Sequence, residues 1–208
     1  MSGAALHKPW RSLRREREAA TFGLWVFLGS EVMFFACALT GYAVYRALWP
    51  EAFAAAGRET NIVYGTVNTA LLLTSSLTMA AAAEGARAEL RRLTLGCLCA
   101  TLAFGLAFLV VKGLEYAEDI EKHLVPGPCF RLEEPQAQVF FAFYWLLTAV
   151  HALHMTIGLG LVSTLTVQAW RGSRPLRSPA FEGAGLYWHF VDLVWILLYP
   201  LLYLLGRA

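Results

Sequence analysis

The side chains that could carry out chemistry in this 208-residue chain are a few ionisable groups inside long apolar stretches. Glu31 lies near the middle of the apolar stretch from Phe22 to Tyr45. If that stretch crosses a bilayer, a charged carboxylate at its centre costs about 3 kcal/mol unless it is protonated, paired or hydrated. Two interpretations therefore stay open for Glu31. It is either a neutral acid bonded to a neighbouring helix or a carboxyl with a direct functional role.

Two pairs of polar residues repeat at helical spacing further along the chain. His151 and His154 are three residues apart, and so are His189 and Asp192, so each pair shares one helix face. Histidines at this spacing can bind a metal or haem, but a closed site needs further ligands, and the four cysteines show no ligand spacing. Hydrogen bonds between helices are a sufficient explanation. We therefore predict an interhelical polar network of His151, His154, His189, Asp192 and Glu115, with no metal site.

Small residues and one charged pair complete the candidates within the apolar stretches. Gly96 and Gly160 belong to rows of small residues at i, i+4 spacing, a pattern typical of closely packed membrane helices. Lys112 and Glu115 share a face near the end of the third stretch. They can extend to the membrane surface or pair with each other.

The composition indicates the class of protein that positions these residues. Hydrophobic residues make up 58% of the chain, charged residues only 15%, and the mean hydropathy is +0.51. These values predict an all-α integral membrane protein, and a net charge of +2 gives no reason to expect nucleic acid as a partner. Five spans are long enough to cross a bilayer: 22–46, 63–83, 93–114, 138–168 and 185–206. Pro200 should bend the fifth span near Ile196.

Basic residues predict the orientation of the spans. They gather before span one, after span two and after span four: Lys8, Arg11, Arg14, Arg15, Arg17, Arg87, Arg91, Arg92, Arg171, Arg174 and Arg177. The positive-inside rule then puts the N-terminus inside and the C-terminus outside. We expect residues 1–21 to form a basic cytoplasmic leader and residues 22–208 a five-helix membrane domain. Span one is too long for a cleaved secretory signal and contains Glu31, so it is interpreted as a retained anchor.

Several motifs resemble subunit III of the haem-copper oxidases. Residues 30–35 (Ser-Glu-Val-Met-Phe-Phe) are similar to that family's Ser-Glu-Val-x-Phe-Phe signature, and residues 68–76 to its next helix. Residues 115–116 match a Glu-Tyr pair, and residues 151–158 resemble a His-Gly/Ala-Leu-His motif. Residues 187–195 (Tyr-Trp-His-Phe-Val-Asp-Leu-Val-Trp) are close to the family's Trp-His-Phe-Val-Asp block. The matches run in order over most of residues 22–206.

The resemblance implies a non-catalytic subunit of a terminal oxidase of the cytochrome c oxidase type, in the inner (plasma) membrane of a bacterium. Such a subunit binds no haem or copper; both lie in its partner, the catalytic subunit I. It flanks subunit I and other oxidase subunits, contacts membrane lipids, supports proton uptake and protects the catalytic site during turnover. Glu31 matches the family's carbodiimide-reactive carboxyl. The chain resembles the five-helix form, which lacks the first two helices beside the cleft that holds a structural phospholipid in the long form.

Two other functions remain open at this point. The chain also resembles the accessory protein of nitric oxide reductases, a shorter relative, and residues 193–203 and a compact first outer loop fit that reading. A free-standing proton channel or transporter is the alternative from another class. Against it, the spans show neither an inverted repeat nor paired broken helices.

Overall fold

The computed structural model describes residues 13–132, 134–172, 175–176 and 178–207. The part of the chain that it describes is built from helices and turns alone. In chain order the helices are α1 (Leu13–Leu48), α2 (Pro50–Glu59), α3 (Ile62–Arg87), α4 (Arg91–Glu121), α5 (Pro135–Arg171), α6 (Pro179–Tyr199) and the π-helical turn η1 (Pro200–Leu204). Five of them are long and apolar enough to cross a membrane. The predicted all-α class and the five spans are confirmed.

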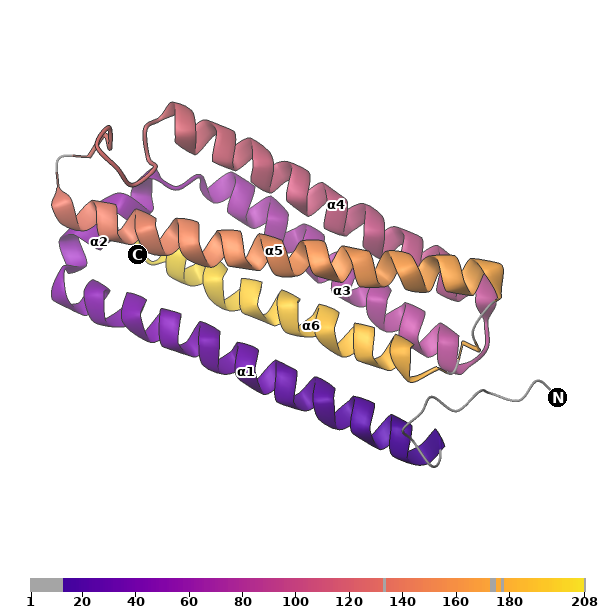
Figure 1. Ribbon diagram of the computed structural model, residues 1–208. Coiled ribbons are helices and arrows are strands. Elements are labelled where there is room, and N and C mark those ends of the chain that lie inside the picture. Colours follow the sequence, from indigo (N-terminus) through magenta and orange to yellow (C-terminus); the bar gives the residue numbers. More distant parts are fainter. Residues whose placement is uncertain (1–12, 133, 173–174, 177, 208) are drawn as a thin grey trace.

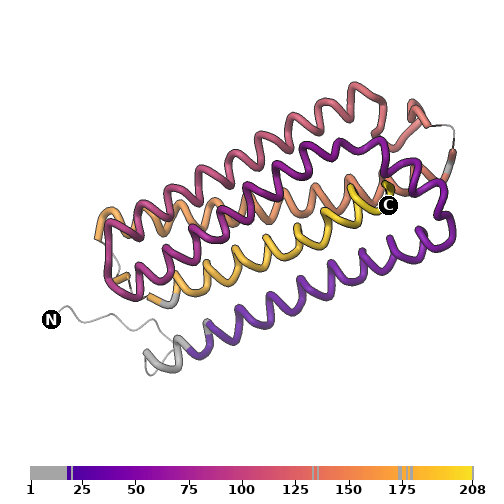
Figure 2. The backbone as a smooth tube through the Cα atoms, turned by 180° about the vertical axis from the view of Figure 1, so that it is seen from behind, coloured from indigo at the N-terminus to yellow at the C-terminus, as the bar shows by residue number. Residues whose placement is uncertain are grey.

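The long helices lie side by side, with α1 at one edge (Figure 1). α3 packs most extensively on α4, and α3, α4, α5 and α6 enclose the buried core. Viewed from behind, α1 again runs along the outside of α6, and the C-terminal end lies near the turn between α1 and α2 (Figure 2). Most of the interior is therefore made by these four helices, and α1 is an outer helix with one face against α5 and α6.

Helix ends follow local sequence signals. Asn61 caps α3 by accepting a hydrogen bond from the backbone N–H of Val63 at 3.1 Å, and Ser178 caps α6. Proline occupies the first turn of α2, α5 and α6, where its missing N–H removes no helical bond. Gly172 ends α5 in the left-handed conformation with φ 66°. These signals fix where α2, α3, α5 and α6 begin and where α5 ends.

Several helix boundaries differ from the predicted ones. α1 begins at Leu13, inside the predicted leader, while Lys8 and Arg11 lie outside the described residues. α4 continues past residue 114 to Glu121, because Glu115 and Asp119 are buried against the bundle instead of facing water. The short helix α2 was not predicted. Its buried face (Ala52, Phe53, Ala56 and Gly57) covers the end of the bundle near η1.

The helix type changes at Pro200. α6 ends at Tyr199, and residues 200–204 form a π-helical turn. The backbone N–H of Leu205 donates to the carbonyl of Pro200 at 3.1 Å, five residues back. The wider turn places Tyr203 in the interior, where it is fully buried.

The glycines that allow close helix packing are not those singled out from the i, i+4 rows. Gly96 and Gly160 have open space where a Cβ would lie, so that prediction is wrong. Gly105 instead lies against Trp188 of α6 and Leu159 of α5, and a Cβ there would meet both at 2.9 Å. Gly158 packs on the same tryptophan. Glycine at these positions of α4 and α5 therefore leaves room for the large aromatic side chains of α6.

Candidate functional site

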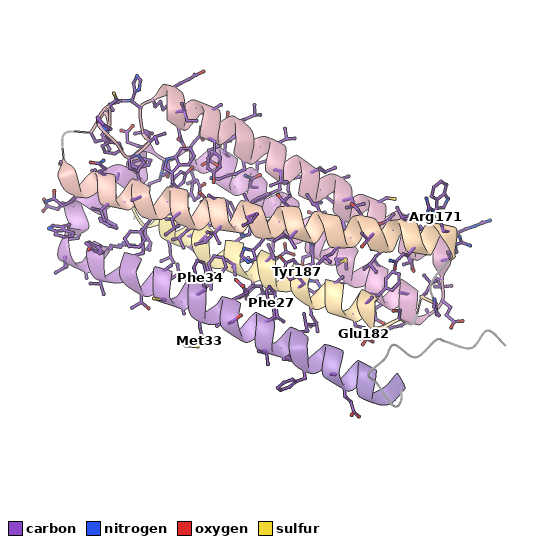
Figure 3. The ribbon with its side chains drawn as sticks, in the orientation of Figure 1. Phe27, Met33, Phe34, Arg171, Glu182 and Tyr187 are labelled. Atoms are coloured by element: carbon purple, nitrogen blue, oxygen red, sulfur yellow. The ribbon has the colours of Figure 1, made fainter. Side chains whose placement is uncertain are left out.

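Glu31 pairs with a histidine on another helix. Its Oε2 lies 3.0 Å from Nε2 of His154, which joins α1 to α5. Both side chains are mostly buried, with 19% and 12% exposure. Tyr187 of α6 donates its hydroxyl to the backbone carbonyl of His154 at 3.0 Å, so three helices meet at this point. In Figure 3, Tyr187 lies toward Phe27 of α1, and the two rings stack with centroids 6.2 Å apart.

The hydrogen bonds of His154 define where its protons lie. Nδ1 is 2.8 Å from the carbonyl of Val150, and a carbonyl can only accept, so Nδ1 carries a hydrogen. Nε2 then needs one more proton for its contact with Glu31. That proton is either on the ring, giving an ion pair, or on the carboxyl, giving a neutral pair. In both cases Glu31 and His154 together hold one proton between α1 and α5.

The outward face of α1 is apolar. Phe22, Trp25 and Met33 are 60% exposed or more, and Met33 lies on the side of α1 away from the other helices in Figure 3. A groove of about 400 Å³ separates part of α1 from α6; it is lined by Trp25, Leu28, Gly29, Val32, Leu186, His189, Phe190 and Leu193. The polar atoms that side chains can bring to this groove are those of the His189 and Trp25 rings, and the other lining residues are apolar or glycine. Such a surface suits lipid tails or a membrane partner, and not water.

A second polar group lies inside the bundle around Lys112 of α4. Its ammonium donates to Glu115 Oε2 at 3.0 Å, to the Tyr144 hydroxyl at 3.1 Å and to the Tyr203 hydroxyl at 2.9 Å. Tyr144 also contacts Asp119 Oδ2 at 2.8 Å. Lys112 and Glu115 are only 2% and 1% exposed, so they pair in the interior and do not extend to the membrane surface. We call these five residues the Lys112 cluster.

Aromatic rings surround the ammonium of Lys112. The ring centroids of Tyr144 and Tyr116 lie 4.7 and 4.8 Å from Nζ, and those of Tyr203 and Trp195 lie 5.6 and 5.7 Å away. The electron-rich faces of such rings attract a cation. Together with the Glu115 carboxylate, they offset the loss of hydration that burying a lysine entails.

The remaining predicted network residues lie in separate places. His189 bonds to Ser76 of α3, with 2.7 Å between Nδ1 and the hydroxyl. The His151 ring contacts Phe108 edge-on and Trp195 at a tilt, with ring centroids 5.5 and 5.0 Å away. Its two nitrogens have no hydrogen-bond partner among the described residues. The Asp192 carboxyl faces the Ser76 hydroxyl. The structure brings Glu31 to His154 and Glu115 to Lys112, but it does not join the five network residues into one chain of bonds.

Sequence reasoning missed Asp119, Tyr144 and Tyr203 as members of a site. Asp119 was open to prediction, because residues 112, 115 and 119 share one face of a helix. The two tyrosines were not, since they reach the cluster from α5 and η1. Within the described residues there is no group of three or more His, Cys, Asp or Glu that could hold a metal, and all four cysteines are free.

The turn after α4 carries charge outside the apolar core. Lys122 pairs with Glu118 at 2.6 Å, and this hydrogen bond raises the pKa of the lysine. Glu118 also accepts from Asn61 at 3.4 Å, which ties the turn to the start of α3. The other end of the bundle carries Arg87, Arg91 and Arg92 at the adjoining ends of α3 and α4. Figure 3 shows Arg171 and Glu182 at this end, in the last turn of α5 and the first turn of α6.

The family profile described as "Cytochrome c oxidase subunit III" matches residues 15–207. The chain belongs to the cytochrome c oxidase subunit III family. "Cytochrome c oxidase subunit 3" of Synechocystis sp. is 34% identical over 193 residues, which cover 88% of this chain and 75% of that protein. "Cytochrome bo(3) ubiquinol oxidase subunit 3" of Pseudomonas aeruginosa is 30% identical, over 89% of this chain and 84% of that protein. The resemblance to the five-helix form of the haem-copper oxidase subunit III family is confirmed.

A third relative has a different architecture. "Heme-copper oxidase subunit I+III" of Aeropyrum pernix is 29% identical over 87% of this chain, which spans only 22% of that longer protein. Family membership and the five apolar helices make the present chain a multi-pass integral membrane protein and a subunit III of a haem-copper oxidase. Subunit III proteins contain no redox centre of their own.

Proposed function

We propose that this chain is a non-catalytic subunit III that flanks subunit I of a cytochrome c oxidase-type complex in a bacterial plasma membrane. The proposed contact with subunit I is supported by the Aeropyrum pernix relative. Its name assigns both subunits to one polypeptide. Fusion in one chain keeps two domains permanently adjacent. A separate chain of the same family would lie beside subunit I by associating with it within the membrane.

The proposed role is to support proton uptake by subunit I and to protect it during turnover. Glu31 is the proposed carbodiimide-reactive carboxyl, and its contact with His154 supports this assignment because it holds one proton inside the apolar region. The basic residues before span one and at the adjoining ends of α3 and α4 support an orientation with the N-terminus inside and the C-terminus outside. The apolar groove between α1 and α6 supports contact with a phospholipid acyl chain. Haem and copper then belong to subunit I.

The test is sustained turnover of the oxidase with and without this chain, at matched haem content. We expect the haem spectrum and the initial oxygen consumption to persist without the chain. Activity should then decay faster during continued turnover, because the flank of the catalytic subunit is exposed. Loss of haem in proportion to the missing chain would contradict a non-catalytic role. Equal decay with and without it would contradict the protective role.

A further inference from the structure

The Lys112 cluster contains more hydrogen-bonding contacts than there are hydrogens on its lysine and its two tyrosine hydroxyls. Six contacts join its members: three from Lys112, two from the Tyr144 hydroxyl to Glu115 and Asp119, and one from the Tyr203 hydroxyl to Glu115. Lys112 supplies three hydrogens, and each tyrosine supplies one. An ionised carboxylate supplies none. One of the six contacts therefore needs a hydrogen that only a protonated carboxyl can provide.

The contact that lacks a hydrogen is made by the Tyr144 hydroxyl. Its single O–H faces Glu115 Oε1 at 3.0 Å and Asp119 Oδ2 at 2.8 Å, and it can donate to only one of them. If Asp119 donates to Tyr144 and Tyr144 donates to Glu115, every contact is filled. The charges agree with this arrangement. Lys112 and an ionised Glu115 cancel, whereas two ionised carboxylates would leave a net charge among residues that are 3% exposed or less.

Of the two carboxyls, Asp119 is the better holder of the proton. Glu115 directly contacts the Lys112 ammonium at 3.0 Å, and an adjacent cation favours the ionised form. Among the described residues, Tyr144 is the hydrogen-bond partner of the Asp119 side chain, and it can accept as readily as donate. We propose that the Lys112 cluster is a proton-binding site in which Glu115 and Asp119 share one proton, resident on Asp119.

The surroundings of Asp119 make this site distinct from an ordinary surface carboxyl. The ionisable groups that face it are Lys112 and Glu115 on α4, Lys122 after α4, Tyr144 on α5 and Tyr203 on η1. Lys122 Nζ forms an ion pair with Glu118 Oε1 at 2.6 Å, and it does not pair with Asp119. The site lies close to the end of α4, two residues before the helix stops, so a proton on Asp119 is near the aqueous boundary.

The composition of the chain makes a direct test possible. Asp119 and Asp192 are its only aspartates. The full chain is produced with carboxyl-labelled ¹³C-aspartate, reconstituted in lipid nanodiscs and measured by infrared spectroscopy at pH 7, where an aspartate in water is ionised. In the Asp192→Asn variant, we expect an isotope-shifted carbonyl band of a protonated acid from Asp119. If that variant does not fold, Asp119→Asn should remove a protonated-acid band from the labelled chain. Finding carboxylate bands alone would overturn the proposal.

Matched substitutions on the same helix face give a second readout. An asparagine at position 119 is neutral and can donate to Tyr144, so Asp119→Asn should shift the melting temperature little. Glu115→Gln removes the anion beside Lys112 and should lower the melting temperature clearly more than Asp119→Asn. Equal losses from both variants, or a protonated-acid band that persists in Asp119→Asn and disappears in Glu115→Gln, would overturn the assignment to Asp119.

Discussion

Glu31 Oε2 on α1 lies 3.0 Å from Nε2 of His154 on α5, on a ring whose other nitrogen donates to the carbonyl of Val150. This contact is the polar link between the outer helix and the bundle at mid-span. Tyr42 and Arg46, nearer the end of α1, add bonds to the carbonyls of Leu201 and Leu205 at 2.7 and 3.4 Å. Since the rest of α1 presents apolar side chains outward, these few contacts orient the helix against α5 and α6.

A hydrophobic carbodiimide should label Glu31, because the reagent partitions into the bilayer and reacts with protonated carboxyls. Glu31→Gln should abolish the labelling without preventing assembly. His154→Phe should keep it, because an unpaired carboxyl at mid-membrane takes up a proton. Glu182→Gln, a change at an exposed carboxylate, is the control and should leave the labelling unchanged. Mass spectrometry of the labelled peptides measures the outcome, and equal labelling of the Gln variant would refute the assignment.

Removing the cation of the Lys112 cluster should destabilise the fold. Lys112→Met leaves Glu115 buried without its ion-pair partner, which costs about 3–5 kcal/mol of unfolding free energy. Lys122→Met is the matched control, because this lysine is 37% exposed and its pair contributes about 0–1 kcal/mol. Detergent-titrated unfolding of the purified chain compares the two variants. A loss no larger for Lys112 than for Lys122 would show that the buried pair adds no stability.

The glycines on α4 give a packing test with an internal control. Gly105→Ala puts a methyl group at 2.9 Å from Leu159 and Trp188, and overpacking of this kind costs about 1–3 kcal/mol. Gly96→Ala meets nothing within 4 Å and should stabilise α4 by about 0.5–1 kcal/mol through helix propensity. The melting temperature should therefore fall for Gly105→Ala and rise for Gly96→Ala. Shifts of the same sign would mean that Gly105 does not lie against Trp188.

The orientation of the helices can be tested with a native thiol. Cys129 is free and exposed in the connection between α4 and α5, which the proposed orientation puts outside. A membrane-impermeant maleimide should label it in intact cells. A cysteine introduced by Glu89→Cys, in the turn between α3 and α4, should react only in inside-out vesicles. The reverse pattern would invert the topology.

The sequence predicted the spans well because apolar length is a local property. Each of the five long helices contains most of its predicted span. At the end of α4, hydropathy falls before the helix ends. Two of the charged residues that cause the fall, Glu115 and Asp119, are buried, and their partners include residues of α5 and η1. A hydropathy pattern contains no information about those partners, so it stops the span too early.

The polar sites were only partly predictable. Glu31 stood out because a single carboxyl interrupts an apolar run, but nothing local indicated His154, which lies on a helix far along the chain. His189 was expected to share a network with His151, yet it bonds to Ser76 of α3 because α3 also packs against α6. Helix spacing identifies a face of one helix. Which helix that face meets depends on the packing of the whole bundle.

The central claim is that this chain works as a non-catalytic subunit of an oxygen-reducing oxidase. The most direct measurement is affinity purification of the tagged chain from its native membrane, followed by an absorption spectrum and an assay of oxygen and nitric oxide consumption. We expect co-purified haem, a subunit I polypeptide and reduction of oxygen. A colourless preparation would indicate a free-standing transporter, and a haem protein that consumes nitric oxide but not oxygen would indicate a reductase accessory protein; either result would contradict the account.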